Sequence, residues 1–281
     1  MRALIVVLVP VGHVVAAEPT VKVTGPPAGK YSEKYAKFVS AESFAILGSA
    51  KVNDYALLEA AYLVNQILAP RPDIRKVLIE SKCRFVVMAP DELTTDVPEH
   101  SKLEPKDYWD RRARGLGATR YHPVVSCGEE NLLCYPGDPY VQENILIHEF
   151  AHAIHLMGLN TAEPKFDGRL KETYDKAMAD ELWKGKYAAT SLEEYWAEGV
   201  QCYFDANAPP DNDHNHVRTR DALKKYDPRL FDLINDVFRE TSWRYVRPPD
   251  RKEPGHLIGY DPKTAKRFHW PNGLENLPPK K

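Results

Sequence analysis

The sequence predicts an α+β fold that is mostly helical, with a small mixed sheet packed beside a central helix. Three observations support this prediction. Residues 55–68 repeat apolar side chains at helical spacing, and residues 84–88 form a short run rich in β-branched and aromatic side chains. Residues 144–156 form a second apolar helical repeat, which encloses the HExxH motif at His148–His152.

The composition is that of an ordinary globular protein, because 43% of the residues are hydrophobic and 28% are charged. A formal net charge of -2 and an isoelectric point near 6.6 give no overall attraction to phosphate backbones or anionic lipids. We therefore expect no nucleic-acid partner. No low-complexity linker or internal repeat divides residues 53–246, which favours one domain, and a monomer is the expected state.

The first 17 residues have the pattern of a secretory signal peptide. A short basic start is followed by the apolar run 3–9, and small residues at 15–17 precede Glu18. A membrane anchor is the weaker interpretation, because the apolar segment is interrupted and too short to span a bilayer, and we expect no stable membrane insertion. The sequence therefore predicts export, either secretion or residence in the periplasm or cell envelope.

Export makes the cysteines candidates for disulfides, since extracellular compartments are oxidising. A bridge between Cys127 and Cys134 is the preferred pairing, because they flank one short segment. Cys83 and Cys202 would then either pair or be buried as small apolar residues. A cysteine zinc site is disfavoured, because the sequence contains no CxxC spacing.

The sequence of the first half of the chain predicts an N-terminal leader, two helices and a strand. Residues 18–52 are expected to form an N-terminal leader whose first part is rich in proline and glycine. A helix over 55–68 follows the capping residue Asn53, and a second helix over 72–81 begins with a proline. The strand 84–88 is a candidate sheet edge, to which an extended peptide could add as a further strand.

Residues 91–142 are rich in proline, glycine and charge, and we expect long functional loops there. Arg111, Arg112 and Arg114 stand at the centre of this section. They resemble a basic patch, but acidic residues lie close to them in the sequence. Paired structural arginines are therefore the favoured interpretation.

The second half is predicted to be mainly helical. The helix that carries the motif is expected from about Tyr140 to Met157, with Gly158 at its C-terminal end. An amphipathic helix is expected over 170–182, and residues 228–238 are expected to form a core helix. Residues 247–281 form a proline-rich tail that either wraps around the domain or stays flexible.

The HExxH motif predicts a zinc site. Two histidines four residues apart share one face of a helix, where both can direct a nitrogen at the same ion. Glu149 lies one step round the helix and can reach a water on that ion. We therefore expect one Zn²⁺ ion bound by His148 and His152, with Glu149 as the general base.

A separate helix supplies a candidate third ligand. Glu194 and Glu198 form a like-charge pair on one helix face, which costs stability unless a positive group lies nearby. Glu194 could instead form a capping box with Ser191, but Thr190 and Glu193 offer the same box one residue earlier. A carboxylate here would complete three protein ligands and leave the fourth position for water. Glu198 is better placed to accept a hydrogen bond from a ligand imidazole.

The joint spacing of three motifs is far more specific than HExxH alone. These motifs are His148–His152, the pattern Tyr187-x6-Glu194-x3-Glu198, and the run PRLFDLIND at residues 228–236. Over roughly residues 144–240 the chain resembles the catalytic domain of the anthrax lethal factor-like zinc metallopeptidases, a family that also includes the Pro-Pro endopeptidases. The loops of residues 91–142 lie outside this resemblance.

The resemblance implies a zincin-like metallopeptidase domain of the gluzincin type that acts on a peptide or protein substrate with one zinc ion. The site residues that it implies are His148, His152 and Glu194 as zinc ligands, Glu149 as the base, Tyr187 as the phenol that stabilises the oxyanion, and Glu198 as a supporting carboxylate.

Other interpretations stay open at this point. A non-catalytic zincin-like domain that binds a surface polymer or protein is one, although the intact Glu149 argues against it. A zinc hydrolase of non-peptide amides is another. Tyr187 could be a core aromatic residue. The segment 211–216 has a metal-binding composition, but a solvated loop is favoured, and His155 is expected to be hydrogen-bonded rather than a ligand.

Overall fold

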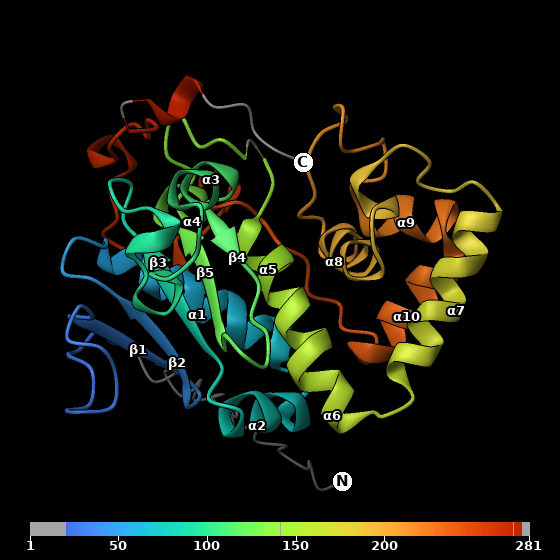
Figure 1. The fold of residues 1–281 in the computed structure, drawn as a ribbon, viewed down its shortest axis with the longest axis horizontal. Helices are drawn as coiled ribbons and strands as arrows, with labels where there is room; N and C mark the ends of the chain where they lie inside the picture. The colour runs from blue at the N-terminus through green and yellow to red at the C-terminus, as the bar shows by residue number, and fades with distance from the viewer. Residues whose placement is uncertain (1–20, 141, 272, 277–281) are drawn as a thin grey trace, which may run out of the picture.

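The computed structural model describes residues 21–140, 142–271 and 273–276. A small mixed sheet occupies one side of the molecule, helices make up the other side, and the motif helix runs between them (Figure 1). The predicted α+β class, mostly helical with a small mixed sheet, is confirmed. The predicted signal peptide, residues 1–17, lies outside the described residues, so export stays a prediction from the sequence.

The sheet has five strands in the order β1-β2-β3-β5-β4. The strands are β1 (Lys37–Ala41), β2 (Phe44–Gly48), β3 (Arg84–Met88), β4 (Gly115–Leu116) and β5 (Val124–Gly128). Strands β1 and β2 form an antiparallel hairpin, β2, β3 and β5 are mutually parallel, and β4 runs antiparallel to β5. The mixed character follows because β2, β3 and β5 are joined by crossovers, whereas β1 and β4 pair through reversals of the chain.

The first two strands lie inside the predicted leader, residues 18–52. They belong to the folded domain because β2 is buried along its whole length, and Val39 of β1 is also completely buried. Burial on both faces removes the alternation of apolar and polar residues by which a half-exposed strand is recognised. The domain therefore begins earlier than the predicted boundary at residue 53.

Strand β3 has the predicted bounds but not the predicted position. It pairs with β2 on one side and with β5 on the other, so both of its hydrogen-bonding edges are used. The prediction that β3 is a sheet edge for peptide binding is therefore wrong. The open edge nearest the motif helix belongs to β4, whose two residues, Gly115 and Leu116, are too few for a strand pattern to appear in the sequence.

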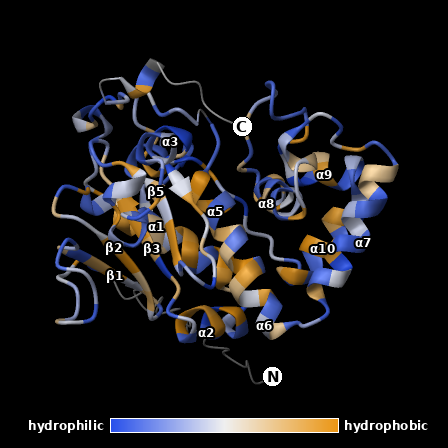
Figure 2. Ribbon diagram, in the orientation of Figure 1, coloured by the Kyte–Doolittle hydropathy of each residue, from blue (hydrophilic) through white to orange (hydrophobic). Residues whose placement is uncertain are grey.

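The first two helices form as the sequence predicts. Helix α1 (Asp54–Leu68) starts after Asn53, whose side-chain oxygen accepts a hydrogen bond from the Tyr55 backbone N–H at 3.0 Å. Helix α2 (Pro72–Glu80) starts at its proline, which has no N–H to satisfy. Figure 2 shows hydrophobic residues on the strands beside α1 and along the motif helix, whereas the short helix α3 (Lys106–Arg112) is mostly hydrophilic.

The motif helix is shorter at its start and longer at its end than predicted. Helix α5 (Ile145–Ala153) begins after Asn144, whose side chain caps the Ile147 N–H at 3.0 Å. The chain continues through a π-helical segment, Ile154–Leu159, into α6 (Asn160–Ala162). Gly158 therefore does not end the helix. Its role is close packing, because a Cβ atom there would lie 2.7 Å from Cγ2 of Ile74 in α2.

The remaining helices form the half of the molecule away from the sheet (Figure 1). They are α7 (Phe166–Ala179), α8 (Leu192–Tyr203), α9 (Arg220–Tyr226) and α10 (Pro228–Val237), while α4 (Glu129–Leu132) lies on the sheet side. Trp196 of α8 stands at their centre, with its ring 5.1 Å from that of Phe166 in α7. Its indole N–H donates to the Ala151 carbonyl at 2.9 Å, which ties α8 to the motif helix.

In its described residues, the proline-rich tail packs against the domain. Leu257 and Phe268 are buried, and two tail side chains bind the completely buried carboxylate of Glu59 in α1. These contacts are Arg251 Nη2 to Oε1 and His256 Nε2 to Oε2, both at 2.6 Å. In the described part of the chain, no helix has the length and apolar character that crossing a bilayer requires.

The predicted disulfide between Cys127 and Cys134 is absent, and all four cysteines are free thiols. Cys127 is buried in β5, where its thiol contacts the Gly128 carbonyl, whereas the Cys134 thiol points to the Asn131 carbonyl. Helix α4 between them holds the two side chains in different surroundings, so closeness in sequence did not produce a bridge. Burial raises the pKa of the Cys134 thiol to about 11.

One of the three central arginines is a structural ion pair, as predicted. Arg114 and Glu130 are both completely buried, and their side chains meet at 2.6 Å. A further guanidinium nitrogen donates to the Ala89 carbonyl at 3.1 Å. This network joins β4 to α4 and to the end of β3.

We expect Glu130→Gln to lower the free energy of unfolding by about 3 kcal/mol, because the change leaves a buried guanidinium without its counterion. Urea unfolding followed by circular dichroism measures the loss. The matched control is Asp91→Asn, which removes the exposed partner of Lys51 and should cost less than about 1 kcal/mol. Equal losses in the two variants would contradict this role for Glu130.

Candidate metal centre

Two helices and one turn bring the predicted site residues together. Helix α5 carries His148, Glu149 and His152, and α8 carries Glu194 opposite them. Tyr187 lies in a short helical turn, Tyr187–Ala189, just before α8. Ser191 is the N-cap of α8, since its hydroxyl accepts from the Glu194 backbone N–H at 3.2 Å.

The cap differs from the predicted one, but the predicted orientation of Glu194 is found. The Thr190 hydroxyl donates to the Tyr187 carbonyl at 2.7 Å and does not cap α8. The Ser191 hydroxyl accepts a hydrogen bond from the backbone N–H of Glu194. The carboxylate of Glu194 does not complete a capping box, because it turns towards the two histidines. The side chain is therefore free for a metal.

Three donor atoms converge on one point. His148 Nε2 lies 3.3 Å from His152 Nε2, and Glu194 Oε2 lies 3.0 Å from the first nitrogen and 3.4 Å from the second. Zinc bonds of about 2.0–2.2 Å in tetrahedral geometry place ligand atoms roughly 3.3 Å apart. Two imidazole nitrogens and a carboxylate oxygen also match the donor types that zinc prefers, so these residues fit the ion.

The electrostatics of the three groups favour a cation between them. Burial works against the charged form of Glu194, but hydrogen bonds from His148 and His152 hold the pKa of its carboxyl far below the usual range. Burial likewise opposes a charge on His148, yet Glu194 and Glu149 raise its pKa well above the usual value. A field that attracts a proton to this nitrogen also attracts a metal ion.

Glu149 lies beside the donor atoms. Burial raises the pKa of its carboxyl, while the charges of His148 and His152 oppose that rise. A carboxylate with a raised pKa takes up a proton more readily than an ordinary one, which suits a general base. Its surroundings are tight on the sheet side, because a Cβ atom on Gly117 would lie 3.3 Å from Glu149 Oε2 and 2.8 Å from His152 Cβ.

Two glycines at the sheet edge are therefore part of the site, and the sequence reasoning missed them. Gly115 of β4 packs against Glu149, since a Cβ there would lie 3.2 Å from Glu149 Cγ. Gly117 packs against His152 in the same way. The signal in the sequence is the alternating pair of glycines around Leu116, which allows a backbone to approach the motif helix closely.

Tyr187 lies over His148, one of the candidate metal ligands, rather than in the core. Its ring lies 6.3 Å from the His148 ring with an interplanar angle of 25°. Burial and the neighbouring Glu194 raise the pKa of its phenol, which keeps the hydroxyl protonated as a donor. The Tyr187 backbone N–H donates to the Asp213 carbonyl at 2.8 Å, so the loop that follows α8 holds this turn in place.

Gln201 orients His148, a role that the sequence reasoning assigned to Glu198. His148 Nδ1 lies 2.8 Å from Gln201 Oε1, whereas Glu198 Oε1 is 3.7 Å away. The Gln201 amide nitrogen donates to the Asn144 carbonyl at 3.1 Å, which leaves its oxygen for the imidazole N–H. Nδ1 is therefore engaged by Gln201, and Nε2 is the ring nitrogen directed at Glu194 and His152, where a bound metal ion would take the place of its proton. Gln201 follows Glu194 by seven residues on the same helix face, which is the signal that could have found it.

Glu198 faces a neighbouring polar cluster. Its Oε2 accepts from the Asn207 amide at 2.9 Å, and its Oε1 lies 3.6 Å from His214 Nε2. Burial opposes the charged form of His214, but Glu198 raises its pKa to about 9. Within segment 211–216, His214 also contacts Asp211 at 2.9 Å, so this segment is less solvated than predicted.

Two further predictions concern groups that were not expected to bind the ion. His155 points away from the site, and its Nε2 lies 2.7 Å from Asp167 Oδ1, as expected of a hydrogen-bonded histidine. A second set of donors, Glu143, His148 and Glu198, also has atoms within 4.8 Å of one another. In that set, however, the nitrogen of His148 is Nδ1. This atom already contacts Gln201, so the second set is the weaker candidate for a metal ion.

We expect Gln201→Leu to weaken zinc binding by about 10–100-fold, because the imidazole of His148 loses the acceptor that fixes its orientation. Competition with a chromophoric chelator measures the affinity. Gln66→Leu in α1, a glutamine remote from the site, is the control and should leave the affinity unchanged. An unchanged affinity in both variants would show that Gln201 does not position the ligand.

A cavity of about 440 Å³ opens over these residues. The residues that line it are His100, Leu103, Tyr108, Trp109, Arg112, Leu116, Gly117, Ala118, Thr119, His122, His148, Glu149, His152, Leu156, Tyr187 and Glu194. Its size is within the range of small-ligand sites, about 300–1,000 Å³. The loops of residues 91–142 thus form one wall of the cavity, opposite the candidate metal ligands.

Arg112 enters this cavity instead of pairing with an acidic residue, which differs from the predicted structural role. Its guanidinium lies 5.8 Å from the Trp109 ring. Burial opposes its charge, but the surrounding Tyr187 and Glu149 raise its pKa, so the group stays positively charged.

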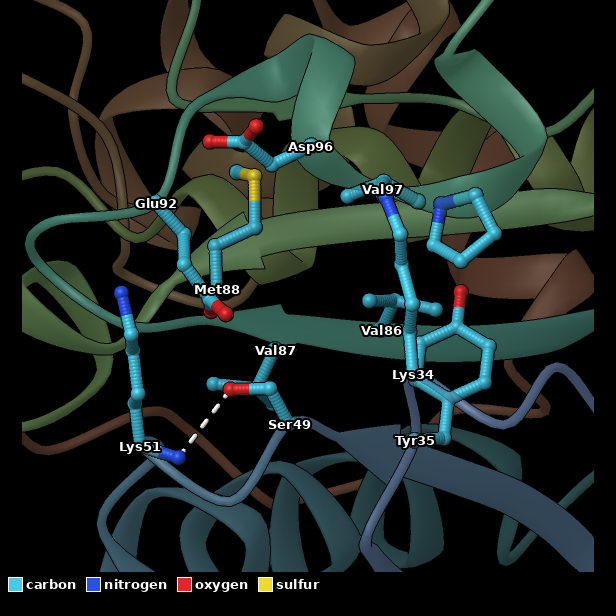
Figure 3. A pocket seen from close by; sticks show the side chains of 11 residues that line it. Lys34, Tyr35, Ser49, Lys51, Val86, Val87, Met88, Glu92, Asp96 and Val97 are labelled. Carbon is cyan, nitrogen blue, oxygen red and sulfur yellow. Dashed lines mark hydrogen bonds between the residues drawn. The ribbon is translucent and has the colours of Figure 1, made fainter.

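A second cavity, of about 310 Å³, lies against the other face of β3 (Figure 3). Its floor includes Val86 and Met88, while the neighbouring residue Phe85 points to the core beside α5. The charged residues at its rim include Lys51 and Glu92, and the residues that line it contain no histidine or cysteine. The cavity over the HExxH helix is therefore the candidate functional site.

No family model matches the sequence, and no curated protein matches it. Among solved structures, the chain is similar to the Pro-Pro endopeptidase PPEP-2 from Paenibacillus alvei, with 18% sequence identity and a TM-score of 0.45. The similarity covers 68% of this chain and 96% of that chain. This similarity is too low to transfer a function, so the functional conclusion depends on the geometry of the site itself.

Proposed function

We propose that the protein is a zinc-dependent metallopeptidase of the zincin-like, gluzincin type, which hydrolyses peptide bonds with Glu149 as the general base. The observation that supports this most strongly is the convergence of His148, His152 and Glu194, with donor atoms 3.0, 3.3 and 3.4 Å apart. A buried carboxylate stands beside them, and a cavity wide enough for a peptide segment opens above them.

Each group of the site would have a separate role in the reaction. A zinc ion, when bound, polarises the substrate carbonyl and lowers the pKa of a coordinated water to about 7. Glu149 takes the proton from the attacking water and returns it to the leaving amine. Tyr187 donates its phenolic hydrogen to the oxyanion that develops on the carbonyl oxygen. Gln201 keeps the His148 ring in the required tautomer.

The substrate would bind in an extended conformation along β4. Among the described residues, one edge of this strand pairs with no other strand, and Gly115 places the strand next to Glu149. Backbone groups on an unpaired edge can accept a further strand, which would carry the scissile bond past the base. The glycines at this edge let β4 pack closely against the motif helix, which would bring a peptide paired with β4 near the candidate ligands.

The test of the proposal is a cleavage assay on a peptide library, read by mass spectrometry, with the protein loaded with one equivalent of zinc. We expect cleavage at defined bonds, its loss on chelation and its return with added zinc. Zinc bound at one equivalent with no peptide cleaved would overturn the peptidase function. Hydrolysis of small non-peptide amides alone would instead support an amide hydrolase.

We expect Tyr187→Phe to lower kcat by about 10²–10³-fold, because it removes one donor to the oxyanion while leaving the ring in place. Steady-state kinetics on a cleaved peptide measure the loss, and zinc content should not change. Tyr31→Phe, which alters a tyrosine packed on Phe38 away from the cavity, is the control and should keep full activity. A normal kcat in Tyr187→Phe would remove this tyrosine from the mechanism.

Export is the second part of the proposal, and it depends on the sequence of residues 1–17. Expression of the full chain in a bacterial host, followed by N-terminal sequencing of the protein recovered outside the cytoplasm, tests it. A mature N-terminus at or near Glu18 is the expected result. Retention of the intact N-terminus in the cytoplasm would contradict it.

A further inference from the structure

We propose that Arg112 forms a subsite for a carboxylate group of the peptide substrate, supplied by an acidic side chain or by the free C-terminus. This inference rests on the proposed peptidase function, because the partner of Arg112 is then part of the substrate. It adds a preference for substrate charge, which neither the HExxH motif nor the metal ligands determine.

The position of Arg112 places it at the substrate. It is the last residue of α3 and lines the same cavity as Glu149, Tyr187 and Glu194. Three residues later the chain enters β4, the free sheet edge beside the base (Figure 1). An extended peptide advances about 3.3 Å per residue, so side chains within a few residues of the scissile bond would pass the guanidinium.

Arg112 has no anionic partner among the residues that the structure describes. Across residues 21–140, 142–271 and 273–276, no carboxylate lies within 4.0 Å of its guanidinium, and it makes no hydrogen bond in that part of the chain. Arg114 differs, because it pairs with Glu130 at 2.6 Å. Arg111, like Arg112, lies over an aromatic ring, that of Trp270 at 4.5 Å, but it does not line the cavity. A partly buried cation without a counterion carries a desolvation cost that a bound anion relieves.

The carboxylates already in the cavity cannot serve as that counterion. Glu194 is held by both histidines, at 3.0 and 3.4 Å. Glu149 must stay free to accept a proton if it is the base. Within the described part of the chain no carboxylate is left to pair with Arg112, and the anion that the proposal assigns to it belongs to the substrate.

The walls of the cavity indicate which anion fits. A guanidinium presents two parallel N–H groups that match a carboxylate. Trp109 forms the adjoining wall, and its indole N–H donates to the Glu104 carbonyl at 3.2 Å, which holds the ring in position. Leu103 and Leu116 add apolar surface. A glutamate side chain matches this combination, with its methylene groups against the ring and its carboxylate on Arg112.

The experiment compares paired peptides that differ only in charge. Glutamate is exchanged for glutamine at each position within three residues of a cleaved bond, and each peptide is made with a free or an amidated C-terminus. We expect wild-type protein to cleave one acidic form at least 10-fold faster than its neutral partner. In Arg112→Gln that ratio should fall to about one, and in Arg112→Glu lysine at the same position should become preferred.

The arms of the experiment separate the two sources of the carboxylate. A preference that follows glutamate at one position identifies a side-chain subsite, whereas a preference lost on amidation identifies recognition of the C-terminus. Arg111→Gln is the matched control, since it removes a neighbouring arginine of the same helix that does not line the cavity. The control should keep the wild-type ratio.

A binding measurement keeps this inference separate from the peptidase proposal. The same peptide pairs are titrated into Glu149→Gln and into Glu149→Gln with Arg112→Gln, and binding is followed by calorimetry. Acidic peptides should bind at least 10-fold tighter than neutral ones to the first protein only. Cleavage without any acidic preference would overturn the subsite alone, and an Arg112-dependent preference without cleavage by wild type would overturn the peptidase function alone. Equal binding of acidic and neutral peptides would also overturn the subsite.

Discussion

We expect the replacement of Glu149 by glutamine to lower the rate of peptide hydrolysis by about 10²–10⁴-fold while zinc stays bound. The amide has nearly the shape of the carboxylate but cannot take a proton from water. The two histidines beside it should keep their positions, because other groups hold them. Gln201 contacts His148 at 2.8 Å, and Glu194 on the opposite helix contacts both imidazoles. Initial rates on a cleaved peptide, with zinc content measured on the same samples, give the two quantities.

The control for this variant is Glu80→Gln, which changes an exposed carboxylate of α2 paired with Lys76. It should retain full activity and full zinc content. A Glu149→Gln protein that loses zinc as well as activity would mean that this carboxylate acts as a ligand. Retained activity would mean that another group is the base, and the mechanism proposed for the site would fail.

We expect the replacement of Glu194 by alanine to abolish stoichiometric zinc binding. The carboxylate is one of three convergent donors, and its loss leaves two imidazoles on one helix to hold the ion. We expect the affinity to fall at least 100-fold, which is more than the loss of an outer hydrogen bond causes. Equilibrium dialysis followed by elemental analysis measures the zinc content, which should drop from about one ion per chain to near zero at micromolar zinc.

The matched control is Glu193→Ala, which removes the adjacent carboxylate of the same helical turn without touching the donor set. This control should bind zinc as tightly as the wild type. If Glu194→Ala also binds zinc normally, while removal of Glu198 releases it, the third ligand is Glu198. That outcome would require His148 to turn its other nitrogen towards the ion and to give up its bond to Gln201.

Features that depend on neighbouring residues in the chain could be predicted from the sequence alone. The bounds of α1, α2 and β3 match the prediction closely, because caps, prolines and apolar repeats act over one or two helical turns. The joint spacing of the HExxH motif with Glu194 was also readable. Both segments are helices, and the periodicity of a helix determines which side chains share a face.

Contacts between distant segments were harder to anticipate. The preferred bridge between Cys127 and Cys134 is absent, since burial in β5 separates the first thiol from the second. The strand expected at the sheet edge is central, because pairing partners are chosen by the packing of the whole sheet. The predicted arginine pairs were right for Arg114 but not for Arg112, although the two residues lie only two positions apart.

The sequence by itself therefore determined the local elements, the HExxH donors and the helix that supplies the third carboxylate. Only the tertiary structure decided that Gln201 rather than Glu198 receives the imidazole N–H, and that β4 is the open edge. It also decided that Arg112 faces the cavity. The physical reason is that periodicity assigns a side chain to a face of its own element, whereas the group it meets there depends on how separate elements pack together.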